Sequence, residues 1–578
     1  MKGVYYLMMV DFVLTNGIVF NTALKCFEKK NIAIIGEVFY YISTEELSNL
    51  TAKEVIDLEG KYVVPGLVDI HMHIESSMIP PSTFSGVALA HGTTSIVADP
   101  HEIANVFGIE GIKQFLKQET KLDIYYAIPS SVPSTTSDRE TTGGIISLQE
   151  VSELLKHPKI IALGEAMNFK GITSEPDSLI QKIIRLVKQE YPLMPLEGHI
   201  PRVSGEDLAK FVYLGLTADH THQTPESIVE KVSNGIFIEL QKKSIIEQNI
   251  NVINQHQLYD HVALVTDDIM PDDLISGHLN ANLKLAVDKG LSVENAIYMS
   301  TYTPARRMGF RNIGMIAPGY LADFIILSDL KEFIIESVYK KGQLVHKKNE
   351  QFFFPAPNED AYPTGYKSSI RCKQLTLRDL SIKCESDAQS ALCNVISIQQ
   401  VGTFTSREQI EIPIINGELA WQDSGLCLIL VMERYGKNGQ IGYGLVKNTL
   451  NKKGAIATTW AHDHHNLMVM GNDLNDIMIA QSKLLDIQGG YVVVSQQNID
   501  AVCPLPIGGI ISDEPLPVVS QNIKNVRGKM KQLGYKNTNE IMSFSTLSLP
   551  VSPQIKITDF GMMDVHNHEL IPIVERYL

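Results

Sequence analysis

Residues 66–77 read GLVDIHMHIESS, in which two histidines stand one residue apart at the end of an apolar run. Alternate side chains of an extended strand point to the same face, so we expect His71 and His73 to project together from a strand over residues 63–70. Two imidazoles on one face can bind a metal ion, although a lone His-x-His is more often a solvated or hydrogen-bonded strand end. The remaining ligands have to come from elsewhere in the chain.

The size and composition of the chain predict a multidomain globular protein. A chain of 578 residues with 44% apolar and 20% charged residues is longer than one hydrophobic core usually supports. The net charge of −15 disfavours nucleic acid or an anionic membrane as the main partner. The six cysteines form no Cys-x-x-Cys pair, which indicates neither a thiolate zinc site nor a disulfide framework. We therefore expect a cytoplasmic protein.

Apolar runs alternate with longer stretches that are compatible with helices in the middle of the chain. Eight such β-then-α units in roughly 240 residues predict a (β/α)₈ TIM-like barrel. The predicted strands cover residues 63–70, 93–98, 124–128, 160–164, 193–197, 215–218, 236–240 and 261–266.

The segments on either side of the barrel predict two further domains. Short β-rich runs lie before the barrel and return after it, so we expect both pieces to form one small β-sandwich domain. Residues 347–368 are rich in Pro, Asn, Gly and charge and predict a linker, followed by a C-terminal α/β domain. The predicted domains are 1–64 plus 311–350 for the β-sandwich, 65–310 for the barrel, and 365–578 for the C-terminal domain.

Polar residues follow the predicted barrel strands, where the loops of such a barrel form a shared cup that carries the chemistry. Six of these residues offer nitrogen or oxygen atoms that can bind a metal ion. Six ligands are too many for one tetrahedral catalytic ion, so we expect two ions bridged by a carboxylate. Asp267, on the last strand, is the natural residue to accept a proton from water and pass it on. These residues predict metal-assisted hydrolysis of a C–N, C–O or P–O bond. The candidate ligands are His71, His73, Glu165, His199, His220 and Asp267.

Several longer motifs resemble the amidohydrolase superfamily and, within it, the bacterial adenine deaminase branch. They are PGLVDIHMHIESSMIPPSTF at 65–84, HGTTSIVADPHEIANVFG at 91–108, LGEAMNF at 163–169, VTDDIMPDDLISGHLN at 265–280 and TTWAHDHHNLMVMG at 458–471. The resemblance implies hydrolysis of adenine to hypoxanthine and ammonia in purine salvage. It also implies two divalent ions, manganese or iron(II), with zinc as a further choice.

The resemblance also implies roles for individual residues. His71 and His73 would bind one ion with Asp267, and His199 and His220 the other, with His222 as the alternative to His220 on its loop. Glu165 stands where many relatives carry a carboxylated lysine and would bridge the two ions. The catalytic set would be Asp267, Glu165, His101 and Asp99. The residues expected to contact the substrate are Glu102, Asp268, Ser76, Ser77 and His464, the last from a segment folded over the barrel mouth.

Other functions remain open from the sequence. Another binuclear amidohydrolase could act on a different cyclic amidine or amide, and a catalytically dead scaffold could keep the barrel shape. All six expected ligands are present, which counts against the scaffold. A nucleic-acid-editing deaminase would need a Cys-x-x-Cys that this chain lacks. The expected partner is the small molecule adenine, and a homodimer is expected as the assembly.

Overall fold

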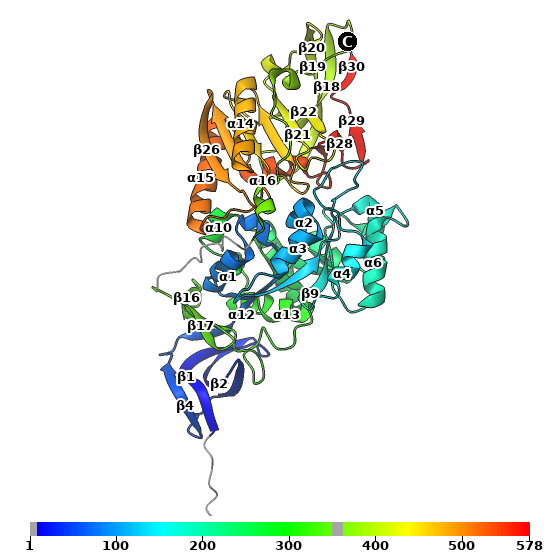
Figure 1. Ribbon diagram of the computed structural model, residues 1–578. Coiled ribbons are helices and arrows are strands. Elements are labelled where there is room, and N and C mark those ends of the chain that lie inside the picture. The colour runs from blue at the N-terminus through cyan, green and yellow to red at the C-terminus, as the bar shows by residue number, and fades with distance from the viewer. Residues whose placement is uncertain (1–7, 350–361) are drawn as a thin grey trace, which may run out of the picture.

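The computed structural model describes residues 8–349 and 362–578. The chain forms three units stacked one on the next, with a parallel barrel between a small β-rich unit and a C-terminal α/β unit (Figure 1). Residues 350–361, the middle of the predicted linker, lie outside the described residues.

The central unit is a closed parallel barrel. Neighbouring strands pair in parallel around the whole ring. The eighth strand position is split, because β13 pairs with β12 whereas β14 pairs with β6. Its strands are β6 (Leu67–His73), β7 (Thr93–Ala98), β8 (Asp123–Ile128), β9 (Ile160–Ala166), β10 (Leu196–Gly198), β11 (Ala218–Asp219), β12 (Phe237–Leu240), β13 (Val262–Leu264) and β14 (Asp267–Asp268). The predicted (β/α)₈ barrel is confirmed.

Amphipathic helices surround the barrel. In α6, for example, the buried residues Ile180, Ile183, Ile184 and Val187 repeat at helical spacing, and the hydroxyl of Ser178 caps the first turn. The helices of this unit are α1 (Pro81–Ala90), α2 (His101–Phe107), α3 (Ile109–Leu116), α4 (Leu148–Leu154), α5 (Phe169–Thr173), α6 (Leu179–Glu190), α7 (Gly205–Leu214), α8 (Pro225–Ser233), α9 (Glu247–His256), α10 (Pro271–Leu274), α11 (Leu279–Asp288), α12 (Val293–Met299) and α13 (Tyr302–Arg307).

The first barrel strand changes its inward face along its length. Val68 and Ile70 pack in the interior cluster of the barrel, whereas Met72 packs in the outer core. Between these positions the β6–β7 pairing shifts register. An irregularity of this kind re-aims the side chains that follow it. His71 and His73 therefore point into the barrel mouth instead of outward.

The prediction of one strand over 63–70 was wrong at its start. β5 (Tyr62–Pro65) pairs with β1 and β15 in the small β unit, and the barrel strand begins only at Leu67. Gly66 lies between the two strands, where only glycine fits because a Cβ would lie 2.3 Å from Thr94 Oγ1. The predicted strand 93–98 matches β7, and the other predicted barrel strands differ from the observed ones at their ends by at most three residues.

The small β unit joins chain segments from both sides of the barrel. β5 and β15 pair antiparallel, which places both segments in one eight-stranded sheet, as predicted. Leu14, Ile32 and Phe324 belong to its buried core. Its strands are β1 (Met8–Asn21), β2 (Cys26–Ile35), β3 (Val38–Ser43), β4 (Leu50–Asp57), β5, β15 (Phe324–Asp329), β16 (Ile334–Lys340) and β17 (Gln343–Lys347).

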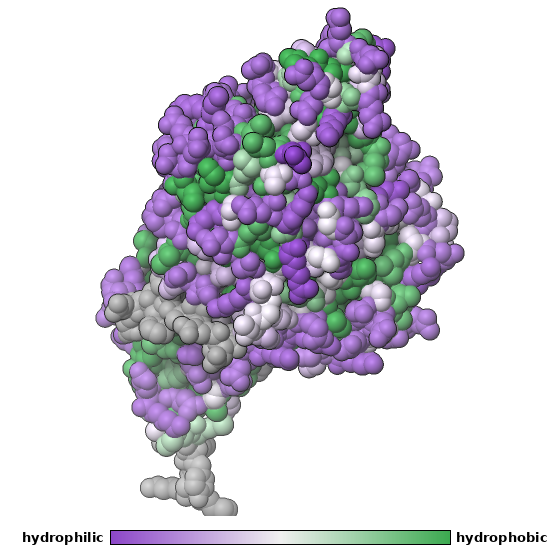
Figure 2. Space-filling view, turned by 45° about the horizontal axis from the view of Figure 1, so that its top comes forward, coloured by the Kyte–Doolittle hydropathy of each residue, from purple (hydrophilic) through white to green (hydrophobic). Residues whose placement is uncertain are grey.

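The C-terminal unit is a ten-stranded sheet with helices against it and a separate three-stranded sheet, β27-β28-β29. Among the described residues, no helix combines the length and apolar character needed to cross a membrane. Hydrophilic side chains cover much of this end of the molecule on the face drawn in Figure 2. The elements are β18 (Ser390–Ile398), β19 (Thr405–Ile415), β20 (Glu418–Leu419), β21 (Cys427–Met432), β22 (Ile441–Lys447), β23 (Ala455–Thr458), β24 (Leu467–Gly471), α14 (Leu474–Ile487), β25 (Gly490–Ser495), β26 (Asn498–Pro504), α15 (Leu516–Leu533), α16 (Glu540–Ser545), β27 (Ile555–Thr558), β28 (Gly561–Asp564), β29 (Glu569–Ile571) and β30 (Val574–Tyr577).

A buried lysine in this unit makes the stability of the protein depend on pH. Lys556 is fully buried, its Nζ donates to the carbonyl of Thr403 at 2.8 Å, and burial lowers its pKa to about 7. In the unfolded chain a lysine keeps its proton to about pH 10.4. Folding therefore expels a proton between about pH 7 and pH 10, and the free energy of unfolding rises with pH across that window.

We predict that Lys556→Met raises the free energy of unfolding at pH 7 by up to roughly 4 kcal/mol, and that this gain disappears towards pH 10. Urea unfolding at both pH values measures it, with the exposed Lys524→Met as the control that shows no pH-dependent difference. A gain of equal size at both pH values would contradict the prediction.

Candidate metal centre at the barrel mouth

The barrel mouth and the C-terminal unit together enclose a cavity of about 120 Å³. The barrel contributes three of the predicted strand-end acids and four histidines to the cavity wall. They are Glu165, Asp267, Asp268, His73, His101, His199 and His220. The C-terminal unit contributes the opposite wall, which includes Thr403, Phe404, His462, Asp463, Met542, Thr546, Leu549, Ser552 and Pro553. The site is therefore assembled from segments that are hundreds of residues apart.

Glu165, at the end of β9, lies at the centre of the histidine cluster. Its Oε1 is 3.3 Å from His73 Nε2, while its Oε2 is 2.7 Å from His199 Nδ1 and 3.1 Å from His220 Nε2. The Asp99 carboxylate fixes this end of β9 by accepting the Glu165 backbone N–H at 2.9 Å. The two carboxylate oxygens thus face imidazoles from different strands, which is the arrangement expected of a bridging ligand.

Asp267 faces the two histidines of the first strand. Its Oδ1 lies 3.4 Å from His73 Nε2 and 3.7 Å from His71 Nε2. The Asp267 backbone has a φ of 58°, in the left-handed region, and the pairing of β14 with β6 holds it there. On the other side, the His71 ring stacks on His220 with centroids 3.8 Å apart.

The electrostatics of the cluster keep both carboxylates ionised. Burial raises the pKa of Glu165, but His220, His199 and His73 more than offset it and hold the pKa well below its usual range. Burial acts on Asp267 in the same way and is outweighed by His71 and His73, so its pKa is also well below its usual range. The cluster therefore presents negative oxygen donors among imidazole nitrogens.

This donor set fits divalent metal ions. Three overlapping groups have ligand atoms within 4.8 Å of one another: His71, His73 and Glu165; Glu165, His199 and His220; and His73, Asp267 and Asp268. Within the described part of the chain, His71 Nε2 and His220 Nδ1 are buried without a hydrogen-bond partner. A buried polar atom left unpaired costs about 1–3 kcal/mol, which a bound ion would relieve. Imidazole and carboxylate ligands suit manganese, iron and zinc.

The loop after β11 brings only one of its two histidines to Glu165. His220 is 2% exposed and contacts both Glu165 and His199. His222 is exposed and lies at the cavity rim. The geometry therefore favours His220 over His222 as the ligand on this loop.

Residues of the Asp-Pro-His-Glu motif lie around the cluster in different roles. Asp99 supports the Glu165 backbone from behind the wall, whereas His101 lines the cavity between two carboxylates. His101 Nδ1 is 3.7 Å from Glu165 Oε1, and its Nε2 is 3.9 Å from Asp463 Oδ1. His101 thus links the candidate metal ligands to the C-terminal unit.

Of the five residues predicted to contact the substrate, only Asp268 lines the cavity. Ser76 donates from its hydroxyl to Glu102 and Asp268, so Ser76 and Glu102 lie behind Asp268 as its support. Ser77 is turned away, because its hydroxyl donates to the carbonyl of Ile74. None of these three residues lines the cavity, and only Ser76 and Glu102 support Asp268.

The segment around His464 does fold over the barrel mouth, but with other side chains facing it. His464 is fully buried, its Nδ1 accepts the Asn466 N–H, and burial lowers its pKa to about 3. His462 and Asp463, in the same loop between β23 and β24, line the cavity instead. His462 and Asp463, and not His464, therefore face the cavity.

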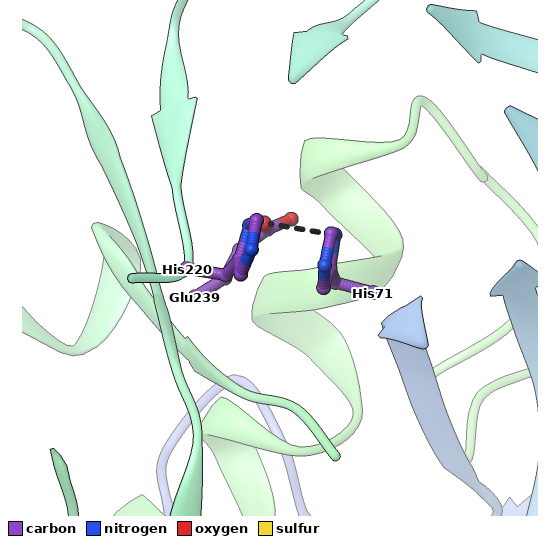
Figure 3. A group of neighbouring side chains, drawn as sticks. All are labelled: His71, His220 and Glu239. Atoms are coloured by element: carbon purple, nitrogen blue, oxygen red, sulfur yellow. Dashed lines mark ion pairs between the residues drawn. The ribbon is translucent and has the colours of Figure 1, made fainter. Parts of the chain in front are cut away.

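Two kinds of residue at the site were not predicted from the sequence. Glu239 of β12 lies beside the cluster, with its Oε2 3.6 Å from His71 Nδ1 (Figure 3). An acid inside an otherwise apolar strand was the available signal. Phe404 and Met542 line the cavity from the C-terminal unit, and no motif marks either position.

Comparison with known proteins agrees with this architecture. Residues 62–345 match the Amidohydrolase family, and residues 402–569 match the Adenine deaminase C-terminal domain. The chain is 51% identical to "Adenine deaminase 2" of Oenococcus oeni, with 98% of both chains covered. It is 48% identical to "Adenine deaminase" of Clostridium perfringens, with 98% of this chain and 100% of that one covered. The chain therefore belongs to the adenine deaminase family of the amidohydrolases.

Proposed function

We propose that this protein is an adenine aminohydrolase, which converts adenine and water to hypoxanthine and ammonia. Water supplies the oxygen that bonds to C6 of the purine, and the C6–N bond breaks as the amino group leaves. Near full-length identity of 46–51% to proteins named adenine deaminase supports this substrate. The observation that carries the chemistry is the Glu165 carboxylate, whose two oxygens face imidazoles from three strand ends at the wall of a small cavity.

The chain's own residues would hold two divalent ions. We assign His71, His73 and Asp267 to one ion, His199 and His220 to the other, and Glu165 to both. Manganese or iron(II) are our first choices, with zinc also compatible with these ligands. When bound, such ions supply Lewis acidity and lower the pKa of a water molecule towards neutrality.

Asp267 is placed to manage the protons of the reaction. It borders the cavity and faces the strand-one histidines, so it can accept a proton from water and return it to the departing amino group. His101 lies on the opposite side of Glu165, within reach of Asp463. We assign Asp267 the general acid–base role and His101, supported by Asp99, a role in holding the reacting groups.

The C-terminal unit would recognise the purine. A flat base needs apolar surface for its faces and polar groups for its edges. The cavity offers Met167, Phe404 and Leu549 for the first, and Asp268, His462 and Asp463 for the second. We therefore propose that the C-terminal unit supplies much of the specificity of the barrel's active site.

The three units correspond, in our proposal, to domains at residues 1–64 plus 311–350, 65–310 and 365–578. The activity would serve purine salvage in the cytoplasm. A homodimer is the assembly we propose, and sedimentation at several protein concentrations tests it.

We predict that removal of metal abolishes turnover. Protein stripped with a chelator and dialysed should show no conversion of adenine, since the ions provide the ionised water at neutral pH. Added manganese should restore activity, reaching a plateau at two ions per chain. Conversion followed by purine absorbance measures this, and undiminished turnover by metal-free protein would contradict the assignment.

Substitution of the proposed acid–base residue should slow the chemical step. Asp267→Asn is expected to lower kcat by about 10²–10⁴-fold, the usual contribution of a positioned proton-transfer group. Steady-state kinetics on metal-saturated protein measures it, with Asp288→Asn on the exposed end of α11 as the control. An Asp267→Asn enzyme with wild-type kcat at full metal loading would rule out this role.

Loss of the aromatic wall should weaken substrate binding. Phe404→Ala is expected to raise KM for adenine about tenfold, since contact between an aromatic ring and a base contributes about 1–3 kcal/mol. The metal content should stay at two ions per chain. Phe560→Ala, in the same unit but outside the cavity lining, serves as the control. An unchanged KM in the Phe404 variant would show that the purine does not bind against this wall.

A further inference from the structure

Ionisable side chains are buried inside the barrel next to the candidate metal ligands, where the interior is otherwise largely apolar. Glu239 of β12 and Glu197 of β10 are 0% and 2% exposed. Their strand neighbours Ile238, Leu240 and Leu196 pack in the outer core, so by alternation both carboxylates point inward. Arg307 of α13 reaches Glu197, with Nη2 2.9 Å from Glu197 Oε1. None of these three residues lines the substrate cavity.

Glu239 is the member of this group that faces a candidate ligand. Its Oε2 lies 3.6 Å from His71 Nδ1, and neither of its oxygens has a hydrogen-bond partner within the described residues. Figure 3 shows the Glu239 carboxylate beside His220 and directed at His71, with the two imidazole rings stacked. Burial and the neighbouring Glu197 raise the pKa of Glu239 well above its usual range. Burying this carboxyl group without a hydrogen-bond partner is costly, so its position needs an explanation.

The two nitrogens of His71 face different carboxylates. Nδ1 faces Glu239, and Nε2 lies 3.7 Å from Asp267 Oδ1. A neutral imidazole carries a proton on one nitrogen and a lone pair on the other. When Nδ1–H donates to Glu239, the Nε2 lone pair is left free on the side of the cluster. Carboxylates that orient metal-binding histidines in this way typically change metal affinity by about 10–100-fold.

We infer that Glu239 is a positioning residue for His71. Glu239 fixes the orientation and tautomer of the His71 ring so that Nε2 is presented to the ion shared with His73 and Asp267. This inference rests on the proposed metal centre. It assigns Glu239 no contact with substrate, in keeping with its absence from the cavity wall.

A direct ligand role for Glu239 is the main alternative. His71, His220 and Glu239 have ligand atoms within 4.8 Å of one another, so the three could hold an ion themselves. Replacing the Glu239 carboxyl group with an amide distinguishes the two roles. A glutamine oxygen can still accept a hydrogen bond from Nδ1–H, whereas a neutral amide is a much poorer metal ligand than a carboxylate.

Titration of metal-free protein with Mn²⁺, read by the electron paramagnetic resonance signal of the free ion, tests the inference. Glu239→Leu should raise Kd for one of the two ions about 10–100-fold. Glu239→Asp, which draws the carboxyl group away from Nδ1 but keeps an acid at this position, should weaken binding of the same ion. Glu239→Gln should keep affinity close to that of the wild type. KM for adenine at saturating Mn²⁺ should stay unchanged in all three variants.

The control is Asp323→Asn, which alters a buried carboxylate paired with Lys340 in the small β unit, away from the cluster. It should leave both Mn²⁺ affinities unchanged. Wild-type affinity for both ions in the Leu and Asp variants would overturn the inference, as would loss of an ion in the Gln variant. Failure of the wild-type protein to bind Mn²⁺ would instead count against the proposed metal centre itself.

Discussion

The position of one buried carboxylate, Glu165, underlies the whole site. A carboxylate taken out of water is costly unless charges and hydrogen bonds compensate it. Here imidazoles from β6 and from the loops after β10 and β11 surround it, and Asp99 holds its backbone. The barrel makes this possible because parallel strands deliver all of their carboxyl ends to one rim. The same rim brings Asp267 to His71 and His73 across almost two hundred residues of sequence.

The regularly spaced apolar runs predicted the barrel. Because the carboxyl ends of its strands meet at one rim, the residues at those ends were then predicted to lie together. The six candidate ligands lie close together because each stands at or just after the end of a barrel strand. They are His71, His73, Glu165, His199, His220 and Asp267. The start of β6 could not be predicted, because an apolar run shows no boundary where one strand leaves the small sheet and the next enters the barrel. Nor does the sequence reveal the register shift after Asp69 that turns both histidines inward.

The outer wall of the cavity was the least predictable part. The loop containing His462 and Asp463 carries a recognisable motif, yet its backbone path decides that these two residues face the cavity and that His464 does not. Phe404 and Met542 come from separate parts of the C-terminal unit and meet only through long-range packing. Ser76 and Glu102 also lie behind the cavity wall, because the Ser76 hydroxyl donates to Glu102 and Asp268, and the sequence does not show this arrangement.

The central claim is that Glu165 bridges two ions. Anomalous diffraction from crystals of the protein loaded with Mn²⁺ tests it most directly, because the scattering of the metal locates each ion independently of the chain. We expect two peaks at the barrel mouth, one against each oxygen of Glu165, with His71 and His73 beside the first and His199 and His220 beside the second. A single peak, or two peaks that Glu165 does not touch, would contradict it.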